Sequence, residues 1–229
     1  MPEIRETAPD TTLTTALIAV LDTLENLAPE MATPGLELVA AQHGDPYSVL
    51  AGTLLSLRTR DQTTLAAFER LRALAPDPQA LAAAEEAAIA GAIYPVAFYR
   101  VKAGQLKALA LALLERHGGR VPDSMEGLLA LPGVGRKTAN LTLSLGFGLP
   151  AVCVDVHVHR IWNRLGLLET NKPDDTESAL REKLPQTHWS RVNPLLVSFG
   201  QALCTPVSPW CSRCPFNGQC PRKGVQKIR

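Results

Sequence analysis

Apolar residues recur every three or four positions along most of the chain, with polar residues between them. This spacing is typical of amphipathic α-helices, in which residues three and four apart share one face. It predicts roughly nine or ten helices. The segments with this spacing are 11–27, 45–57, 61–75, 77–93, 98–119, 123–133, 136–148, 155–167, 174–184 and 188–204.

Start and stop signals agree with this pattern. Asp45 and Asp77 each precede a proline, which favours a helix start. The segment 98–119 ends on two glycines, which favours a helix end. The apolar run LPAVCV, residues 149–154, is too short to build a sheet. We therefore expect an all-α fold.

The stretch LPGVGRKTAN, residues 131–140, interrupts the helical pattern. Gly133 and Gly135 allow backbone angles that other residues resist, so we expect a tight turn. The N–H groups of such a turn, and those that open the next helix, can point at an anion. Lys137 would then stand beside that anion. The alternative is an ordinary connection between two helices with a solvated lysine.

Composition and charge narrow the classes of function. The chain has 229 residues, of which 46% are hydrophobic and 20% charged, as in ordinary soluble proteins of one or two domains. Its net charge is only +1, so a surface that binds nucleic acid must be local. One local excess follows Cys204, where no acidic residue occurs. The basic residues there are Arg213, Arg222, Lys223, Lys227 and Arg229.

The sequence shows neither a membrane-spanning segment nor a signal peptide. No apolar run reaches the roughly 20 residues that span a bilayer. The first residues, MPEIRETAPD, carry charges of both signs and do not resemble a signal peptide. We expect a cytoplasmic protein without a membrane partner.

Four of the five cysteines lie close together with the spacing C-x6-C-x2-C-x5-C; they are Cys204, Cys211, Cys214 and Cys220. Three explanations are open. An iron–sulfur cluster accepts one short C-x2-C pair with looser flanks, which favours it over zinc, whose cysteines usually form two short pairs. Disulfides fit least in an intracellular helical protein. Cys153, in the apolar AVCV, is expected to be buried and inert.

Three features of the sequence together resemble the endonuclease III family of DNA glycosylases. They are the stretch 131–140, the sequence VDVHVHR at 154–160 and the cysteine tail, which occur in the family's order and spacing. The sequence AFYRVKAGQL at 97–106 also resembles a family stretch. The resemblance runs from Asp45 to about Arg222.

The resemblance implies a two-domain helix–hairpin–helix DNA glycosylase fold. Residues 39–149 would form a six-helix barrel that contains the helix–hairpin–helix, at about 124–145. Residues 1–38 with 150–229 would form a domain that holds a [4Fe–4S] cluster, with the cluster loop at 204–220. The four cysteines of that loop would be the cluster ligands.

The resemblance also implies the chemistry. Lys137 would attack C1′ of the damaged nucleoside and form a Schiff base, and Asp155 would stabilise the cationic sugar. Taken alone, Asp155 is more simply a helix N-cap. The protein would be a bifunctional DNA glycosylase and AP lyase of base excision repair. It would remove oxidised pyrimidines and nick the abasic site by β-elimination.

Seven residues are expected at the DNA: Leu131, Gly133, Val134, Gly135, Arg136, Arg58 and Phe98. The hairpin amides would bind a backbone phosphate. Arg58 and Phe98 would fill the space that an extruded base leaves. Here the chain departs from the family, because LLSLRTRD has Arg58 where glutamine is common. Phe98 stands where leucine is common, and Ala97 where glycine is common. These departures concern the substrate range and not the lyase chemistry.

The expected partner is double-stranded DNA with damaged bases or abasic sites, bound by a monomer in the bacterial nucleoid. Two other interpretations keep the fold. One is a catalytically weak or inactive damage binder, and the other an adenine-mismatch glycosylase, which usually lacks this lysine. A zinc-bound transcription factor would explain the cysteines and the hairpin but not Lys137 with Asp155.

Overall fold

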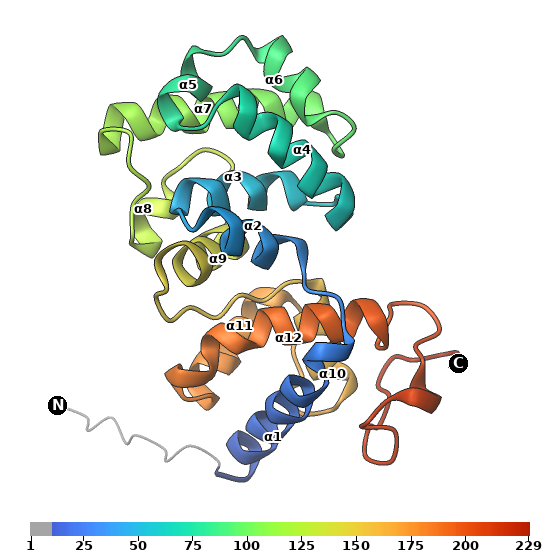
Figure 1. The fold of residues 1–229 in the computed structure, drawn as a ribbon. Helices are drawn as coiled ribbons and strands as arrows, with labels where there is room; N and C mark the ends of the chain where they lie inside the picture. Colours follow the sequence, from blue (N-terminus) through green and yellow to red (C-terminus); the bar gives the residue numbers. More distant parts are fainter. Residues whose placement is uncertain (1–10) are drawn as a thin grey trace, which may run out of the picture. The chain divides into compact units, whose positions relative to one another are not determined.

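The computed structural model describes residues 11–229, and all regular structure in that range is helical (Figure 1). The predicted all-α fold is therefore confirmed. The chain divides into two compact units, Thr33–Ala151 and Val152–Arg229 with Met1–Ala32.

The described residues form twelve α-helices, more than the pattern predicted. Two differences account for this. The helix α2, Gly35–His43, was not expected. The segment 77–93 was expected to be one helix but forms two, α5 (Pro78–Ala83) and α6 (Glu86–Ile93).

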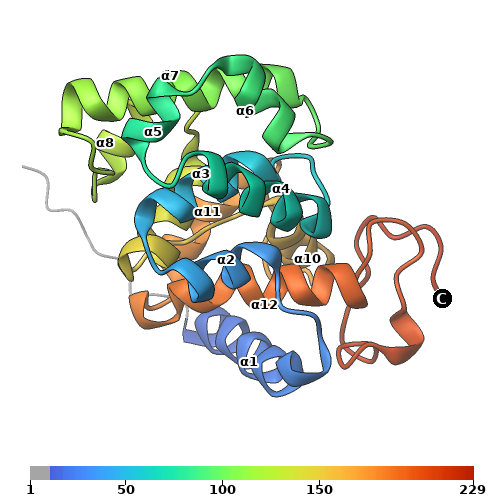
Figure 2. The same cartoon turned by 45° about the horizontal axis from the view of Figure 1, so that its top comes forward.

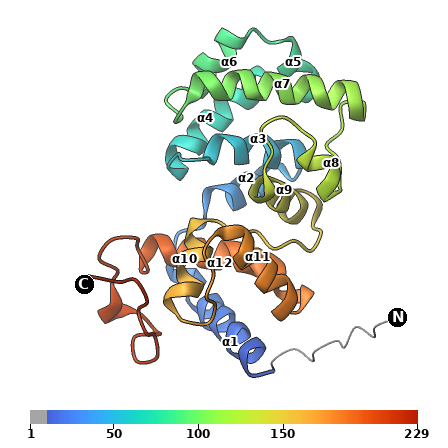
Figure 3. The same cartoon turned by 180° about the vertical axis from the view of Figure 1, so that it is seen from behind.

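Packing explains the break between α5 and α6. The backbone is extended at Ala84 and Glu85, where ψ is 142° and 138°. Both short helices lie against α7 (Tyr99–His117), as Figure 3 shows. Lys107 of α7 also donates a hydrogen bond to the Ala84 carbonyl at 2.8 Å. Alanine favours a continuous helix, so tertiary contacts override the local propensity here.

The unit Thr33–Ala151 is built around α3, whose residues Tyr47–Leu55 are all buried. Helices α2, α4, α7 and α9 contact α3. Figure 2 shows α2 and α4 beside α3. The fully buried side chains of Leu50, Leu54 and Leu55 lie in the core that these helices share. In this unit α3 spans Pro46–Ser56, α4 spans Asp61–Leu74, α8 spans Met125–Leu129 and α9 spans Arg136–Leu141.

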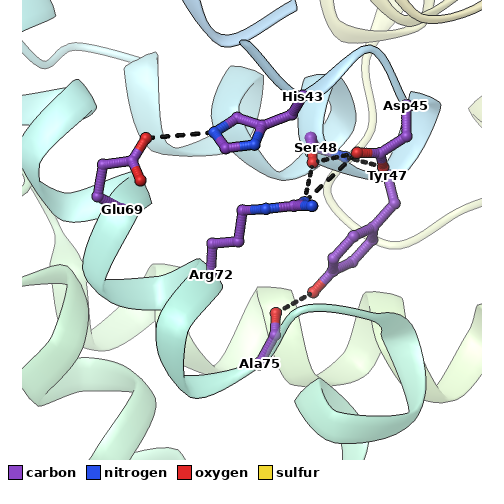
Figure 4. Close-up of polar contacts among 7 residues, drawn as sticks. All are labelled: His43, Asp45, Tyr47, Ser48, Glu69, Arg72 and Ala75. Atoms are coloured by element: carbon purple, nitrogen blue, oxygen red, sulfur yellow. Dashed lines mark hydrogen bonds and ion pairs between the residues drawn. The ribbon is translucent and has the colours of Figure 1, made fainter.

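A polar cluster ties the start of α3 to α4 (Figure 4). Asp45 is the N-cap of α3, and its carboxylate accepts from the Ser48 backbone N–H at 2.9 Å and from the Ser48 hydroxyl at 2.6 Å. Arg72 of α4 donates to the Ser48 hydroxyl at 2.5 Å and to Asp45 at 3.4 Å. The cluster thus joins two helices at the end of α3 opposite to Ser56.

Two further contacts flank this cluster in Figure 4. The Tyr47 hydroxyl donates to the Ala75 carbonyl at 3.2 Å. Burial, reinforced by the carboxylates of Asp77 and Asp45, raises the pKa of Tyr47, so the phenol keeps its proton for this bond. His43 lies 3.2 Å from Glu69, which joins α2 to α4.

The other unit contains α1 (Thr11–Leu27), α10 (Val156–Arg164), α11 (Pro173–Lys183) and α12 (Trp189–Ala202). Both α1 and α10 lie against α12, and α11 contacts α10. Large apolar side chains fill the centre, among them Leu17, Leu21, Leu24, Trp162 and Phe199, all at most 1% exposed. No helix within 11–229 has both the length and the apolar character needed to cross a bilayer.

Candidate functional site

The predicted hairpin is a β-turn between α8 and α9. The Val134 N–H donates to the Leu131 carbonyl at 3.2 Å, which closes the turn. Pro132 is its second residue and Gly133, with φ of +75°, its third. Proline followed by a residue with positive φ is typical of a type II turn, and that third position favours glycine.

We expected both glycines to adopt backbone angles that other residues resist, but Gly135 does not. It is the N-cap residue of α9, with φ of −102° and ψ of 178°, which other residues adopt equally well. A Cβ built there meets no atom within 4 Å. The absence of a side chain at this position leaves open space in front of α9.

The hairpin presents backbone, not apolar side chains. Leu131 is 3% and Val134 is 8% exposed, and both pack in the core of their unit. Gly133, Gly135 and Arg136 are exposed. Any DNA contact at Leu131 and Val134 would therefore use main-chain atoms.

Lys137 is the second residue of α9 and is partly exposed. The residues directly after it, Thr138–Leu141, are all buried. The first turn of α9 is thus anchored in the core, which fixes where the Lys137 side chain leaves the helix.

Asp155 is the N-cap of α10 and is 7% exposed. Its Oδ1 accepts from the backbone N–H groups of His157 at 2.8 Å and Val158 at 3.0 Å. The capping role that the sequence suggests for Asp155 is therefore present. These bonds orient the carboxylate, whatever else it does. Lys137 and Asp155 belong to different units, so each is placed within its own unit.

Arg58 and Phe98 contact each other within the unit Thr33–Ala151. The Arg58 guanidinium carbon lies 5.9 Å from the centre of the Phe98 ring, within the range of a cation–π interaction. Both residues have φ of +58°, which is uncommon for residues other than glycine. Arg58 is exposed and Phe98 is 60% exposed. The two residues expected at an extruded base thus form one exposed pair.

Sequence reasoning missed Lys102, which is 5% exposed beneath this pair. Its ammonium donates to the carbonyls of Leu55 at 2.9 Å and Leu57 at 2.6 Å, and lies 3.4 Å from the Thr59 hydroxyl. Burial lowers the pKa of Lys102 to about 8. The only sequence signal was the position of this lysine in the family-like stretch 97–106.

The four tail cysteines line one cavity, which is partly open to solvent. The pKa of the Cys214 thiol is raised to about 11, mainly by burial and in part by the nearby Cys204, Cys220 and Cys211. The four sulfurs are therefore close enough to influence one another. Thiolates are the ligands that iron–sulfur clusters and zinc prefer, so the donor set fits a metal centre.

Hydrogen bonds join both ends of this cysteine loop to Arg164 of α10. The Arg164 guanidinium donates to the Thr205 and Pro206 carbonyls, both at 2.7 Å, and lies 3.5 Å from the Cys204 sulfur. The Cys220 thiol donates to the Arg164 carbonyl at 3.3 Å. The thiolates that a metal centre requires would have this buried cation beside them.

The cysteine geometry also bears on the choice between zinc and a cluster. Within residues 11–229, no three His, Cys, Asp or Glu side chains converge as a single metal ion would require. One zinc ion needs its sulfurs about 2.3 Å from a common point. The four thiols line one cavity, and a [4Fe–4S] cluster takes four cysteine ligands.

Comparison with known proteins gives consistent matches. The family described as HhH-GPD superfamily base excision DNA repair protein matches residues 51–186. Endonuclease III of Thermotoga maritima is 45% identical over 188 residues, which cover 81% of this chain and 88% of that protein.

Two more matches extend the comparison. Endonuclease III homolog 1, chloroplastic, of Arabidopsis thaliana is 42% identical over 76% of this chain but only 48% of its own length. This chain therefore spans about half of that protein. A solved endonuclease III, trapped as a covalent intermediate with DNA, has a TM-score of 0.83 and 30% identity, over 91% of this chain and 96% of that one.

Proposed function

Because the chain belongs to the HhH-GPD superfamily of base excision DNA repair proteins, we propose that it removes oxidised pyrimidines from duplex DNA and nicks the resulting abasic site. The protein is a DNA glycosylase/AP lyase, as its endonuclease III relatives indicate. The proposal adds the lesion class, the residues and the cofactor. It treats the acting species as a monomer.

The observation that carries the proposal is the position of Lys137. It stands in the first turn of α9, directly after the hairpin, on a helix whose next residues are buried. In its neutral form the Lys137 amine attacks C1′, and the C1′–N bond to the base breaks. The bond between C1′ and the ring oxygen O4′ then breaks, O4′ takes up a proton to become a hydroxyl, and C1′ forms an imine with Nζ. Removal of a C2′ proton expels the 3′ phosphate, which nicks the strand.

Asp155 is the proposed partner of Lys137. A carboxylate stabilises the positive charge that develops on the sugar as the base leaves. Its hydrogen bonds from the first turn of α10 hold the carboxylate in one orientation. Such preorganisation avoids the cost of reorienting the group during the reaction.

The remaining proposed residues bind the DNA. In this proposal the hairpin from Leu131 to Arg136 binds a backbone phosphate through main-chain N–H groups and the exposed Arg136. Arg58 and Phe98 occupy the gap that the extruded nucleotide leaves. We assign the six-helix barrel, residues 39–149, to the unit Thr33–Ala151, and the cluster domain to the other unit.

The proposed cofactor is a [4Fe–4S] cluster held by Cys204, Cys211, Cys214 and Cys220. When bound, such a cluster cross-links the loop and supplies a redox-active centre. Arg164 lies beside Cys204 and offsets part of the thiolate charge. We expect brown protein with about four irons per chain. Cys214→Ser should lose the colour and Cys153→Ala, outside the loop, should keep it; zinc in place of iron would contradict the cluster.

Borohydride trapping tests the proposed chemistry. The protein is mixed with a duplex that carries thymine glycol or an abasic site, and the imine is reduced to a stable cross-link. Lys137→Ala removes the amine. Lys137→Arg is the matched control, because it keeps the positive charge but is not a nucleophile at neutral pH.

We expect cross-links to both duplexes with the native chain and none with either variant. Cross-links to the abasic duplex alone would limit the protein to lyase chemistry. No cross-link from folded, brown protein would favour the damage binder that Arg58, in place of glutamine, brings into consideration. A cross-link with Lys137→Arg would assign the nucleophile to another residue.

A further inference from the structure

The exposed pair of Arg58 and Phe98 is held in a strained backbone. Residues Ser56–Thr59 form a β-turn closed by a hydrogen bond from the Thr59 N–H to the Ser56 carbonyl at 3.0 Å. Leu57 has φ of −55° and ψ of 114°, and Arg58 has φ of +58°. These three angles match a type II turn, whose third position strongly favours glycine. Arginine resists this position because its Cβ approaches its own carbonyl oxygen.

The alternative to this strain is a type I turn. The two types differ mainly in the orientation of the peptide between the second and third residues. In a type I turn the Leu57 carbonyl would point the other way, and Arg58 would relax to negative φ. Whatever binds the Leu57 carbonyl therefore decides the turn type and the direction in which the Arg58 side chain leaves.

Lys102 binds that carbonyl. The 2.6 Å distance from Nζ to the Leu57 oxygen is the shortest of its three contacts, and the Leu55 carbonyl and the Thr59 hydroxyl complete the set. A charged donor forms stronger hydrogen bonds than a neutral one. An ammonium has three hydrogens, which match the three acceptors.

The same residue is tied to Phe98. The Lys102 backbone N–H donates to the Phe98 carbonyl at 3.0 Å, in the first turn of α7. A second link runs from the Ala97 N–H to the Thr59 hydroxyl at 3.2 Å. Lys102 thus joins the residues adjacent to Arg58 to the helix start that carries Phe98.

We propose that Lys102 is a positioning residue that holds Arg58 and Phe98 as one rigid unit for insertion into duplex DNA at a missing base. The proposal rests on the proposed function of Arg58 and Phe98. It assigns Lys102 no contact with the substrate. Lys102 acts by fixing the peptide between Leu57 and Arg58.

Equilibrium binding tests this without depending on catalysis. The probe is a duplex that contains a tetrahydrofuran residue, a stable abasic analogue that forms no imine, and the reference is the intact duplex. The quantity measured is the ratio of the two dissociation constants. The variants are Lys102→Met, Arg58→Gly and the double variant. Lys107→Met is the matched control, because Lys107 also lies on α7 and donates to a loop carbonyl, that of Ala84.

We expect Lys102→Met and Arg58→Gly each to lower the preference for the abasic duplex about tenfold, since small misplacements in such sites have large effects. The double variant should lose less than the product of the two single effects, because residues that act through one another are not additive. Lys107→Met should keep the native preference.

Three results would overturn the proposal. They are an unchanged preference in Lys102→Met, effects that multiply in the double variant, and equal loss of affinity for both duplexes. If Lys102→Met does not fold, Lys102→Gln, which keeps a donor, replaces it in the same comparison. An Arg58→Gly variant with native preference would instead refute the insertion role of Arg58, and failed trapping would refute the proposed catalysis separately.

Discussion

Two β-turns in the unit Thr33–Ala151 have the same closing hydrogen bond and the same left-handed third residue. In the turn 131–134 that residue is Gly133, with φ of +75°. In the turn 56–59 it is Arg58, with φ of +58°. The first turn presents only backbone, whereas the second presents a long cationic side chain.

The difference lies in what keeps each turn in shape. Glycine adopts positive φ without steric cost, so the turn 131–134 needs no external support. Arginine at the same position costs about 1–2 kcal/mol, and three hydrogen bonds from Lys102 oppose that cost. A side chain at the third position of such a turn therefore depends on a second, buried residue.

The largest effect is expected at the glycine turn. Gly133→Val should lower the free energy of unfolding by about 2–3 kcal/mol, because a β-branched residue is strained at positive φ. Urea denaturation measures it. Gly135→Ala, at negative φ with open space around its Cβ, should cost less than about 1 kcal/mol, because alanine is a poorer N-cap than glycine but is not strained there. Equal losses at both glycines would contradict the turn geometry.

The next effect concerns the lysine of the arginine turn. Burial lowers the pKa of Lys102 to about 8, whereas an unfolded lysine titrates near 10.4. Between these values the unfolded chain binds more protons than the folded one, so stability rises with pH. From pH 7 to 9.5 the native chain should gain about 1–2 kcal/mol relative to Lys102→Met. Parallel stability curves for the two proteins would contradict the lowered pKa.

A smaller effect is expected at the other end of α3. Arg72→Met removes the partly exposed bonds to Ser48 and Asp45 in the polar cluster of Figure 4. It should lower the free energy of unfolding by about 0.5–1 kcal/mol, less at high salt. The preference for abasic duplex should not change. A changed preference would mean that any loosening of α3 disturbs Arg58.

The smallest effect has the opposite sign. Arg58→Gly relieves the strain at positive φ but gives the unfolded chain more freedom, so we expect a net gain of about 0.5 kcal/mol. Thermal and urea unfolding measure it, with Arg60→Gly as the control at a neighbouring exposed residue of ordinary φ, −70°. A clear loss of stability in Arg58→Gly would show that the side chain contributes more than the strain costs.

Helical periodicity was enough to predict the all-α fold, because apolar faces recur in every long helix. It could not predict the break at Ala84 and Glu85, where two short helices, and not one long helix, pack against α7. It also missed α2, whose apolar face is short and whose N-cap is the unusual Pro34. The first failure arises from contacts between elements, and the second from weak local signals.

Some residues of the candidate site could be predicted from the sequence, and others could not. The motif around Lys137 and the grouping of the four cysteines are visible in the linear sequence. Buried cations are not, because Lys102 and Arg164 look like any surface lysine or arginine until the loops that they bind are in place. The roles of Lys137, Asp155 and the cysteines stay predictions.

Arg164 has a consequence for how the tail folds. Its side chain holds the start of the cysteine loop and its carbonyl holds the end, so contacts about 40 and 56 positions apart in sequence converge on one residue. Bringing distant parts of a chain together costs configurational entropy, and such contacts tend to form late. The last turn of α10 thus serves as a template that must exist before the tail can close. Loss of the Arg164 contacts would leave the tail as an open, protease-sensitive segment even where the rest of its unit is folded.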